Sequence, residues 1–174
     1  MSKIIAIMLL LCCGMMLFGC ADDNGRRKAE QQKTIVVTDS VGRKVELPYP
    51  LERVAVCNVY NAELITAVGA IDKIVGVDNY IFKDQSGFKN AMNYEKLAEL
   101  APQAVIITGE GTWRDAQEML DRFGIKVIVI NSYYTDQFAD NCRLIGRIFG
   151  REEQAEELVN YFNDKLAYIQ KQLQ

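Results

Sequence analysis

Residues 53–80 read Arg-Val-Ala-Val-Cys-Asn-Val-Tyr-Asn-Ala-Glu-Leu-Ile-Thr-Ala-Val-Gly-Ala-Ile-Asp-Lys-Ile-Val-Gly-Val-Asp-Asn-Tyr, which is the pattern of a βαβ unit. Residues 54–57 form an unbroken apolar run, typical of a strand buried on both faces of a parallel sheet. Asn61 is the predicted N-cap of the following helix, and Gly69 can adopt the left-handed conformation that ends one. Residues 74–77 then supply a second short strand. We expect the two strands to be parallel, with a right-handed crossover.

The loops that follow both strands leave the same edge of the expected sheet, where the carboxyl ends of parallel strands meet. Open α/β sheets bind their ligands at this edge. The two loops carry Tyr60, Tyr80 and Phe82. The sequence therefore places three aromatic side chains at the expected ligand edge.

The alternation of strand and helix continues downstream of residue 80. Residues 34–47 alternate around an Asp39-Ser40-Val41-Gly42 turn, which predicts a β-hairpin. We therefore expect an α/β fold in which a mainly parallel sheet is flanked by helices, with an N-terminal hairpin and a long C-terminal helix. The further expected elements are helices over 93–100, 113–123 and 138–149, and strands over 104–107 and 127–130.

A purely helical pattern covers residues 151–174. Its first half can pack on the preceding helix, whereas its second half, from Leu166, has no evident partner in the sequence. Most helical stability comes from packing an apolar face, so we expect the segment after Tyr168 to fray or to self-associate. The apolar stripe consists of Ala155, Leu158, Val159, Phe162, Leu166, Ile169 and Leu173.

Composition excludes several classes of function. The chain has 174 residues and a formal net charge of −3, which gives no support for electrostatic binding of nucleic acid. It contains no histidine, so His-dependent triads and the commonest transition-metal ligand are absent. We expect neither a protein-bound metal nor a cofactor from these residues.

The N-terminus resembles an export signal. One early positive charge, Lys3, precedes an apolar run that is shorter than the ~20 residues of a transmembrane helix. The run ends in Leu17-Phe18-Gly19-Cys20, which resembles the bacterial lipobox, so residues 1–19 are the predicted signal peptide and Cys20 the predicted lipidation site. An uncleaved anchor with an incidental cysteine is the alternative. Residues 20–33 contain no large apolar residue and are the expected flexible tether.

Two cysteines lie in the expected folded part, Cys57 in a strand and Cys142 in a helix. Small buried core residues are the simpler interpretation. A disulfide is compatible with export, but the sequence does not place the two Cα atoms within bridging distance.

Neither a nucleotide site nor an enzyme site is complete in the sequence. The Gly109-Glu110-Gly111 loop lacks the third glycine of a dinucleotide fingerprint, because residue 114 is Arg114. Ser132 with nearby Asp136 is the only candidate for a nucleophile and base at the expected ligand edge. We interpret the chain as a binding protein, and a small α/β enzyme using this edge is the alternative from another class.

Aromatic residues follow every expected strand at this edge. Together with Arg114 they predict a surface for a large, partly apolar and anionic ligand, although packing is the better explanation of each one alone, with ligand contact equally good only for Tyr80. The set consists of Tyr60, Tyr80, Phe82, Trp113, Tyr133 and Tyr134.

Several segments resemble substrate-binding lipoproteins of the iron-siderophore and cobalamin ABC importers. The first is Thr38-Asp39-Ser40-Val41-Gly42-Arg43-Lys44-Val45-Glu46-Leu47-Pro48, followed by Arg53-Val54-Ala55-Val56. Gly76-Val77-Asp78-Asn79-Tyr80, Asn93-Tyr94-Glu95-Lys96-Leu97, the segment Pro102 to Ile107, and Phe123-Gly124-Ile125-Lys126-Val127 match further parts of the family. The resemblance covers residues 34–174.

This resemblance implies two α/β lobes joined by one rigid helix, with the ligand between them. Residues 34–150 would be the first lobe and residues 151–174 the start of the interlobe helix, while a second lobe is missing from the sequence. The expected function is capture of a metal chelate (ferric siderophore, haem or cobalamin) and its delivery to a membrane permease, by a protein lipid-anchored outside the cell membrane. Tyr80 matches a cleft tyrosine, and Glu95 matches the acidic residue that docks on the permease. A lobe that only engages a partner protein remains a third interpretation.

Overall fold

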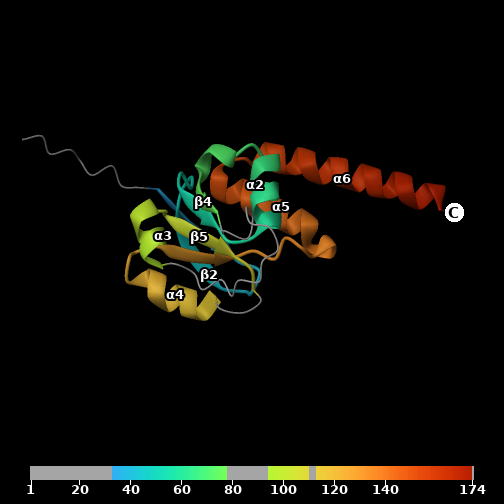
Figure 1. The fold of residues 1–174 in the computed structure, drawn as a ribbon. Coiled ribbons are helices and arrows are strands. Elements are labelled where there is room, and N and C mark those ends of the chain that lie inside the picture. The colour runs from blue at the N-terminus through green and yellow to red at the C-terminus, as the bar shows by residue number, and fades with distance from the viewer. Residues whose placement is uncertain (1–32, 78–93, 110–112, 174) are drawn as a thin grey trace, which may run out of the picture. The chain divides into compact units, whose positions relative to one another are not determined.

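A β-hairpin opens the part of the chain that the structure describes. The computed structural model describes residues 33–77, 94–109 and 113–173 (Figure 1). β1 (Thr34–Thr38) and β2 (Lys44–Pro48) pair antiparallel, with Val37 opposite Val45. Gly42 has a φ of 79° in the turn, a conformation that glycine adopts without steric cost. The predicted hairpin is therefore confirmed.

Four parallel strands form the central sheet: β3 (Val54–Val56), β4 (Ile74–Val77), β5 (Ala104–Ile107) and β6 (Lys126–Val129). They lie in the order β4-β3-β5-β6. Val54 pairs with Ile74 on one side and with Ala104 on the other, so β3 is an inner strand. The expected parallel sheet is confirmed, with each strand within one residue of its predicted position.

Helices cover both faces of the sheet (Figure 1). α2 (Val59–Ala67) and α5 (Phe138–Phe149) lie on one face, and α3 (Tyr94–Leu100) and α4 (Trp113–Asp121) lie on the other. Successive strand side chains point to opposite faces, so one sheet supplies two separate hydrophobic cores. The first core includes Val54, Val56, Ile106 and Ile128, and the second includes Ala55, Val105 and Val127.

The two cysteines of the folded part lie in different cores. Cys142 is buried in the first core, and Cys57 packs against the second. Both are reduced in the structure. The sheet lies between them, so the disulfide that the sequence left open does not form.

The start of α2 differs from the prediction. Asn58 is the N-cap, and its side chain accepts hydrogen bonds from the backbone N–H groups of Tyr60 and Asn61. The prediction of Asn61 as the N-cap was wrong: Asn61 lies in the first turn, fully buried, and its Nδ2 donates to the Ile130 carbonyl oxygen at 3.0 Å. Asn58 and Asn61 are equally suitable N-cap residues by type. The hydrogen bond from Asn61 to Ile130, directly after β6, is what distinguishes them.

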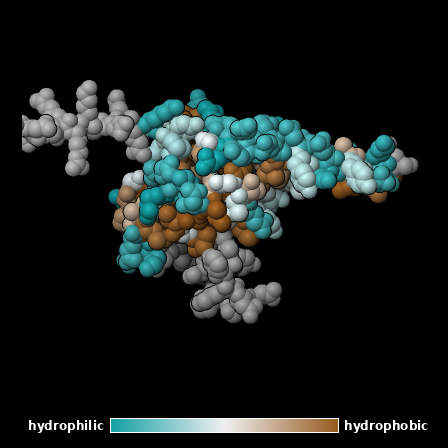
Figure 2. All heavy atoms as spheres, turned by 90° about the horizontal axis from the view of Figure 1, so that it is seen from above, coloured by the Kyte–Doolittle hydropathy of each residue, from teal (hydrophilic) through white to brown (hydrophobic). Residues whose placement is uncertain are grey.

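α6 (Glu152–Gln172) follows α5 after a left-handed Gly150, at which a helix end was predicted. Its first half packs on α5, where Ala155 and Val159 are fully buried. Figure 1 shows its second half extending away from the sheet, and Figure 2 shows apolar atoms there beside hydrophilic ones. Leu166, Ile169 and Leu173 are 43%, 53% and 82% exposed, so the described residues leave the second half of the stripe uncovered, as expected. None of the described helices is long and apolar enough to cross a membrane.

Candidate ligand-binding edge

The strand order reverses at the carboxyl ends of β3 and β5. The chain passes from β3 to β4 on one side and then crosses back to β5 on the other. As a result α2 leaves β3 toward one face and α4 leaves β5 toward the opposite face. In open α/β sheets this reversal forms the crevice in which ligands bind. We call the described residues around it, 57–60, 108–109, 113–114 and 130–136, the carboxyl edge.

A network of amide and hydroxyl groups holds the loops of the carboxyl edge together. Asn131 accepts the Gly109 N–H on its Oδ1 at 2.7 Å, and its own N–H donates to the Ser40 hydroxyl oxygen at 3.1 Å. Asn141 of α5 donates from Nδ2 to the Asn131 carbonyl at 3.1 Å and accepts from the Ser40 hydroxyl at 3.3 Å. These bonds join the loop after β5, the hairpin turn and α5. Hydrogen-bond networks in which every member has a partner restrict their members to one arrangement.

Asn61 extends this network to the loop after β3. While its Nδ2 donates to the Ile130 carbonyl oxygen, its Oδ1 accepts a hydrogen bond from the Ser132 hydroxyl. Ser132 was the candidate nucleophile of the enzyme alternative, but its hydroxyl donates to an amide oxygen rather than to Asp136, which is exposed. An amide is not a general base, so the serine has a structural partner here and not a catalytic one.

The hairpin turn closes the free edge of β6. The Asp39 side chain is fully buried; its Oδ2 accepts the Val129 N–H at 3.3 Å and lies 2.7 Å from Arg43 Nη2. The Ser40 N–H donates to the Val129 carbonyl at 2.9 Å, and Arg43 Nη2 donates to the Val127 carbonyl at 3.1 Å. An edge strand exposes unpaired backbone groups unless something covers them, and here the hairpin turn covers those of β6.

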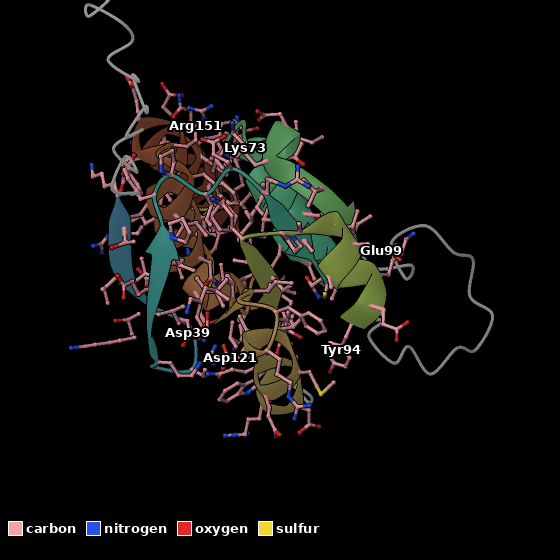
Figure 3. The ribbon with its side chains drawn as sticks, turned by 90° about the vertical axis from the view of Figure 1, so that its left-hand side faces the viewer. Asp39, Lys73, Tyr94, Glu99, Asp121 and Arg151 are labelled. Carbon is pink, nitrogen blue, oxygen red and sulfur yellow. The ribbon has the colours of Figure 1, made fainter. Side chains whose placement is uncertain are left out.

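Figure 3 shows Asp39 and Tyr94 toward one end of the described part of the chain, whereas Lys73 and Arg151 lie toward the other end.

Trp113 joins the hairpin turn to the start of α4. Its side chain belongs to the second core, and the residue is only 9% exposed. The guanidinium carbon of Arg43 lies 4.2 Å from the indole centroid, and that of Arg114 lies 4.3 Å from it. Both distances are within the range of cation–π contacts. Arg114 itself is exposed, so its charge is accessible at the carboxyl edge.

The tyrosines of the carboxyl edge differ in exposure. Tyr60 is 49% exposed and Tyr134 is 41% exposed, whereas Tyr133 is half-buried. The rings of Tyr133 and Tyr134 lie 4.3 Å apart between centroids, at an angle of 45°. Ligand contact by Tyr60, Trp113, Arg114 and Tyr133 stays a prediction.

Tyr94, at the start of α3, was missed by the sequence reasoning. Burial raises the pKa of its phenol, and the negative charges of Asp115 and Cys57 raise that pKa further. Tyr94 and Cys57 pack against the second core, and Asp115 lies in the first turn of α4. No period or spacing in the sequence links them, and the same is true of Ser40, Asn131 and Asn141.

Some predicted residues lie outside the described part. Tyr80, Phe82, Cys20 and the Glu110-Gly111 pair belong to this group. Glu95 is described: it is exposed in the first turn of α3. Within residues 33–77, 94–109 and 113–173, no group of three or more Cys, Asp or Glu side chains could hold a metal ion.

Comparison with known proteins identifies the fold. A periplasmic solute binding protein from Veillonella parvula matches at 25% identity with a TM-score of 0.66, over 80% of this chain and 48% of that chain. The petrobactin-binding protein YclQ from Bacillus subtilis matches at 19% identity with a TM-score of 0.66, over 80% and 53%. The molybdate-binding protein MolA from Haemophilus influenzae matches at 23% identity with a TM-score of 0.62, over 76% and 52%. The last two likenesses show the fold alone.

The chain spans about half the length of each of these structures. A search of curated proteins found no significant match. The family model described as periplasmic binding protein matches residues 54–174, which include the whole parallel sheet and every described helix from α2 to α6. This match confirms the resemblance found in the sequence, and it agrees with the expectation of a binding protein rather than an enzyme. The chain belongs to the periplasmic binding protein family.

Proposed function

We propose that this chain forms one lobe of the substrate-binding protein of an ABC importer, and that it captures a metal chelate for delivery to a membrane permease. Ferric siderophores, haem and cobalamin are the ligands that we place first. The family supports a binding role outside the cytoplasm. The other half of the site would come from a second lobe, because the chain spans only about half of the matched structures.

The observation that carries the proposal is the chemistry of the carboxyl edge. Tyr60 and Tyr134 present partly exposed rings, and Arg114 presents an exposed guanidinium. Among the described residues no carboxylate lies within ion-pair distance of Arg114, so its charge is available to an anion. Aromatic faces and a planar cation suit a large ligand with apolar surface and negative charge. The hydrogen-bonded loops hold these groups in place, which lowers the entropy cost of binding.

The test is equilibrium dialysis of this chain, completed by its second lobe, against ferric catecholate and hydroxamate siderophores, haem, cobalamin and molybdate. Trp113 is the only tryptophan, and its emission should be quenched by the chelate that binds. Arg114→Met and Tyr60→Ala should each weaken that binding. Tyr80→Ala should weaken it by about 1–3 kcal/mol if the ring is buried against the ligand. Tyr161→Ala is the matched control, since Tyr161 is 61% exposed on α6.

Two results would contradict the proposal. One is binding of none of the chelates, or of molybdate only. The other is chelate binding that survives every edge substitution unchanged, which would place the ligand elsewhere on the lobe.

We also propose that Cys20 carries a lipid that anchors the protein to the outer face of the cell membrane. The lipobox-like Leu17-Phe18-Gly19-Cys20 and the polar residues behind it support this. Labelled fatty acid should enter the wild-type chain and not Cys20→Ser. Equal labelling of both would remove the anchor from the proposal.

A further inference from the structure

Arg43 is a hairpin residue that lies outside the carboxyl edge. Its side chain forms hydrogen bonds with three other residues, of which only Asp39 belongs to the hairpin turn. Its Nε and Nη2 donate to Asp39 Oδ2 at 3.0 and 2.7 Å, its Nη1 donates to the Gln117 side chain, and its Nη2 also reaches Val127. The guanidinium is thus fixed by groups on the hairpin, on α4 and on β6.

The guanidinium of Arg43 lies against the indole ring of Trp113, and the guanidinium of Arg114 lies against the same ring. Arg43 and Arg114 lie 4.2 and 4.3 Å from the centroid of Trp113. Placing two cations on one indole would be unfavourable if both charges were uncompensated. The fully buried carboxylate of Asp39 compensates the charge of Arg43. Arg114 is left as the exposed cation of the pair.

We infer that Arg43 is a positioning residue: through Trp113 it holds the Arg114 guanidinium at the carboxyl edge, in place for an anionic group of the ligand. Arg43 does not touch the ligand itself. The hairpin turn thereby sets the position of Arg114 on α4, which is more than 70 residues away in the chain. The hydrogen bond from Arg43 to Gln117 is a direct contact between the hairpin and the same helix. The role of Arg114 toward a ligand rests on the proposed function, whereas the coupling between the two arginines does not.

The coupling can be measured without any ligand. A guanidinium that lies over an indole experiences a ring-current shift, so the Nε–Hε resonance of Arg114 reports its contact with Trp113. In the full chain, Arg43→Lys should reduce this shift by at least about half, because a lysine lacks the planar group that packs on the ring. Arg122→Lys is the matched control: Arg122 directly follows the C-terminal end of α4, pairs with Glu118 and should leave the shift unchanged.

A purely structural role for Arg43 makes a different prediction. If Arg43 only stabilises the fold, Arg43→Lys lowers the melting temperature but leaves the Arg114 resonance where it was, and the inference is overturned. Should Arg43→Lys fail to fold, Gln117→Leu, which removes one bond that fixes the guanidinium, provides the second variant and should reduce the shift in the same direction.

A binding cycle then tests the consequence for the ligand. With the chelate that binds most tightly in the dialysis panel, Arg43→Lys should weaken binding by about two- to thirtyfold, the range of a cation–π contact. The same substitution should have no further effect in an Arg114→Met background. An equal loss in both backgrounds would show that Arg43 acts independently of Arg114 and would overturn the inference. If no chelate binds, the proposed function fails, and the resonance of Arg114 still decides whether Arg43 positions it.

Discussion

Single buried polar residues connect the segments of this lobe. Asp39 receives N–H groups from Val41, Arg43 and Val129, and Asn61 bridges Ile130 and Ser132. Removing one partner of such a group costs more than its hydrogen bonds contribute, because the other partner stays buried and unsatisfied. These residues therefore determine which loops can lie at the carboxyl edge.

The thiol of Cys142 should make the stability of the fold depend on pH. Burial raises the pKa of its thiol from 9.0 to about 11, and Arg143 lowers it by a smaller amount. The folded state therefore keeps this proton at pH values where the unfolded state has lost it. This contribution to stability is complete below pH 9.0 and is lost as the pH rises toward about 11.

The free energy of unfolding should accordingly fall more steeply between those two pH values in the wild type than in Cys142→Ala. Urea denaturation at intervals across the range measures the two slopes. Below pH 9.0 the two slopes should agree, because the Cys142 thiol keeps its proton in both the folded and the unfolded state. Parallel slopes for wild type and Cys142→Ala would contradict the burial of the thiol.

At the scale of elements, the contact between α5 and α6 depends on one glycine. A Cβ on Gly146 would lie 2.5 Å from the Ala155 Cβ and 2.9 Å from the Arg151 carbonyl oxygen. Since the oxygen belongs to the backbone, the helices would have to separate. We expect Gly146→Ala to cost about 1–3 kcal/mol in thermal or urea unfolding.

Gly76→Ala is the matched comparison. A Cβ there would lie 2.7 Å from Cδ1 of Leu100, the end of a flexible side chain that can move aside. Its cost should be clearly smaller than that of Gly146→Ala. The reverse order would mean that α5 and α6 can separate more easily than one leucine can change its rotamer.

The end of α6 supports a second prediction at this scale. The structure keeps the helix to Gln172, yet every described residue after Phe162 is exposed. Amides after Tyr168 should exchange faster than those near Val159, and Ile169→Glu should change stability by less than about 0.5 kcal/mol. If the exposed stripe instead self-associates, sedimentation will show a concentration-dependent dimer that Ile169→Glu/Leu173→Glu abolishes. A monomer protected to its last turn would contradict both expectations.

At the scale of the whole molecule, ligand capture and permease docking should use separate surfaces. We expect Glu95→Arg to reduce transport, or affinity for the permease, while chelate binding stays unchanged. Glu99→Arg is the control on the same helix, because its side chain is 69% exposed and pairs with Lys96 of the same helix. The measurement is uptake of labelled chelate by cells that express the protein together with its permease.

Two outcomes would argue against a docking role for Glu95. Equal effects of Glu95→Arg and Glu99→Arg would show a general effect of charge reversal on α3. Unchanged transport in both variants would leave Glu95 as a carboxylate that stabilises the first turn of its helix.

The sequence alone determined the class of fold and the position of each strand. Apolar runs such as residues 54–57 and 104–107 are local signals. A short run that is apolar on both faces is typical of a strand inside a parallel sheet with helices on either side. The end of α5 before Gly150 and the uncovered second half of α6 were also predicted, since both follow from the chemistry of adjacent residues. The resemblance to the family rests on several such segments taken together.

Only the tertiary structure decided which polar residues organise the carboxyl edge. Asn58 and Asn61 are equivalent as helix-start signals, and the contact of Asn61 with Ile130, 69 positions away, separates them. In the sequence Arg43 appeared only within the segment from Thr38 to Pro48 that carries the family resemblance, and nothing local indicated that it lies on Trp113. The periodicity of helices and strands follows from neighbours in the chain. The contact between Arg43 and Trp113 depends instead on α4 and the hairpin packing against the same strand, β6. No local pattern in the sequence specifies that packing.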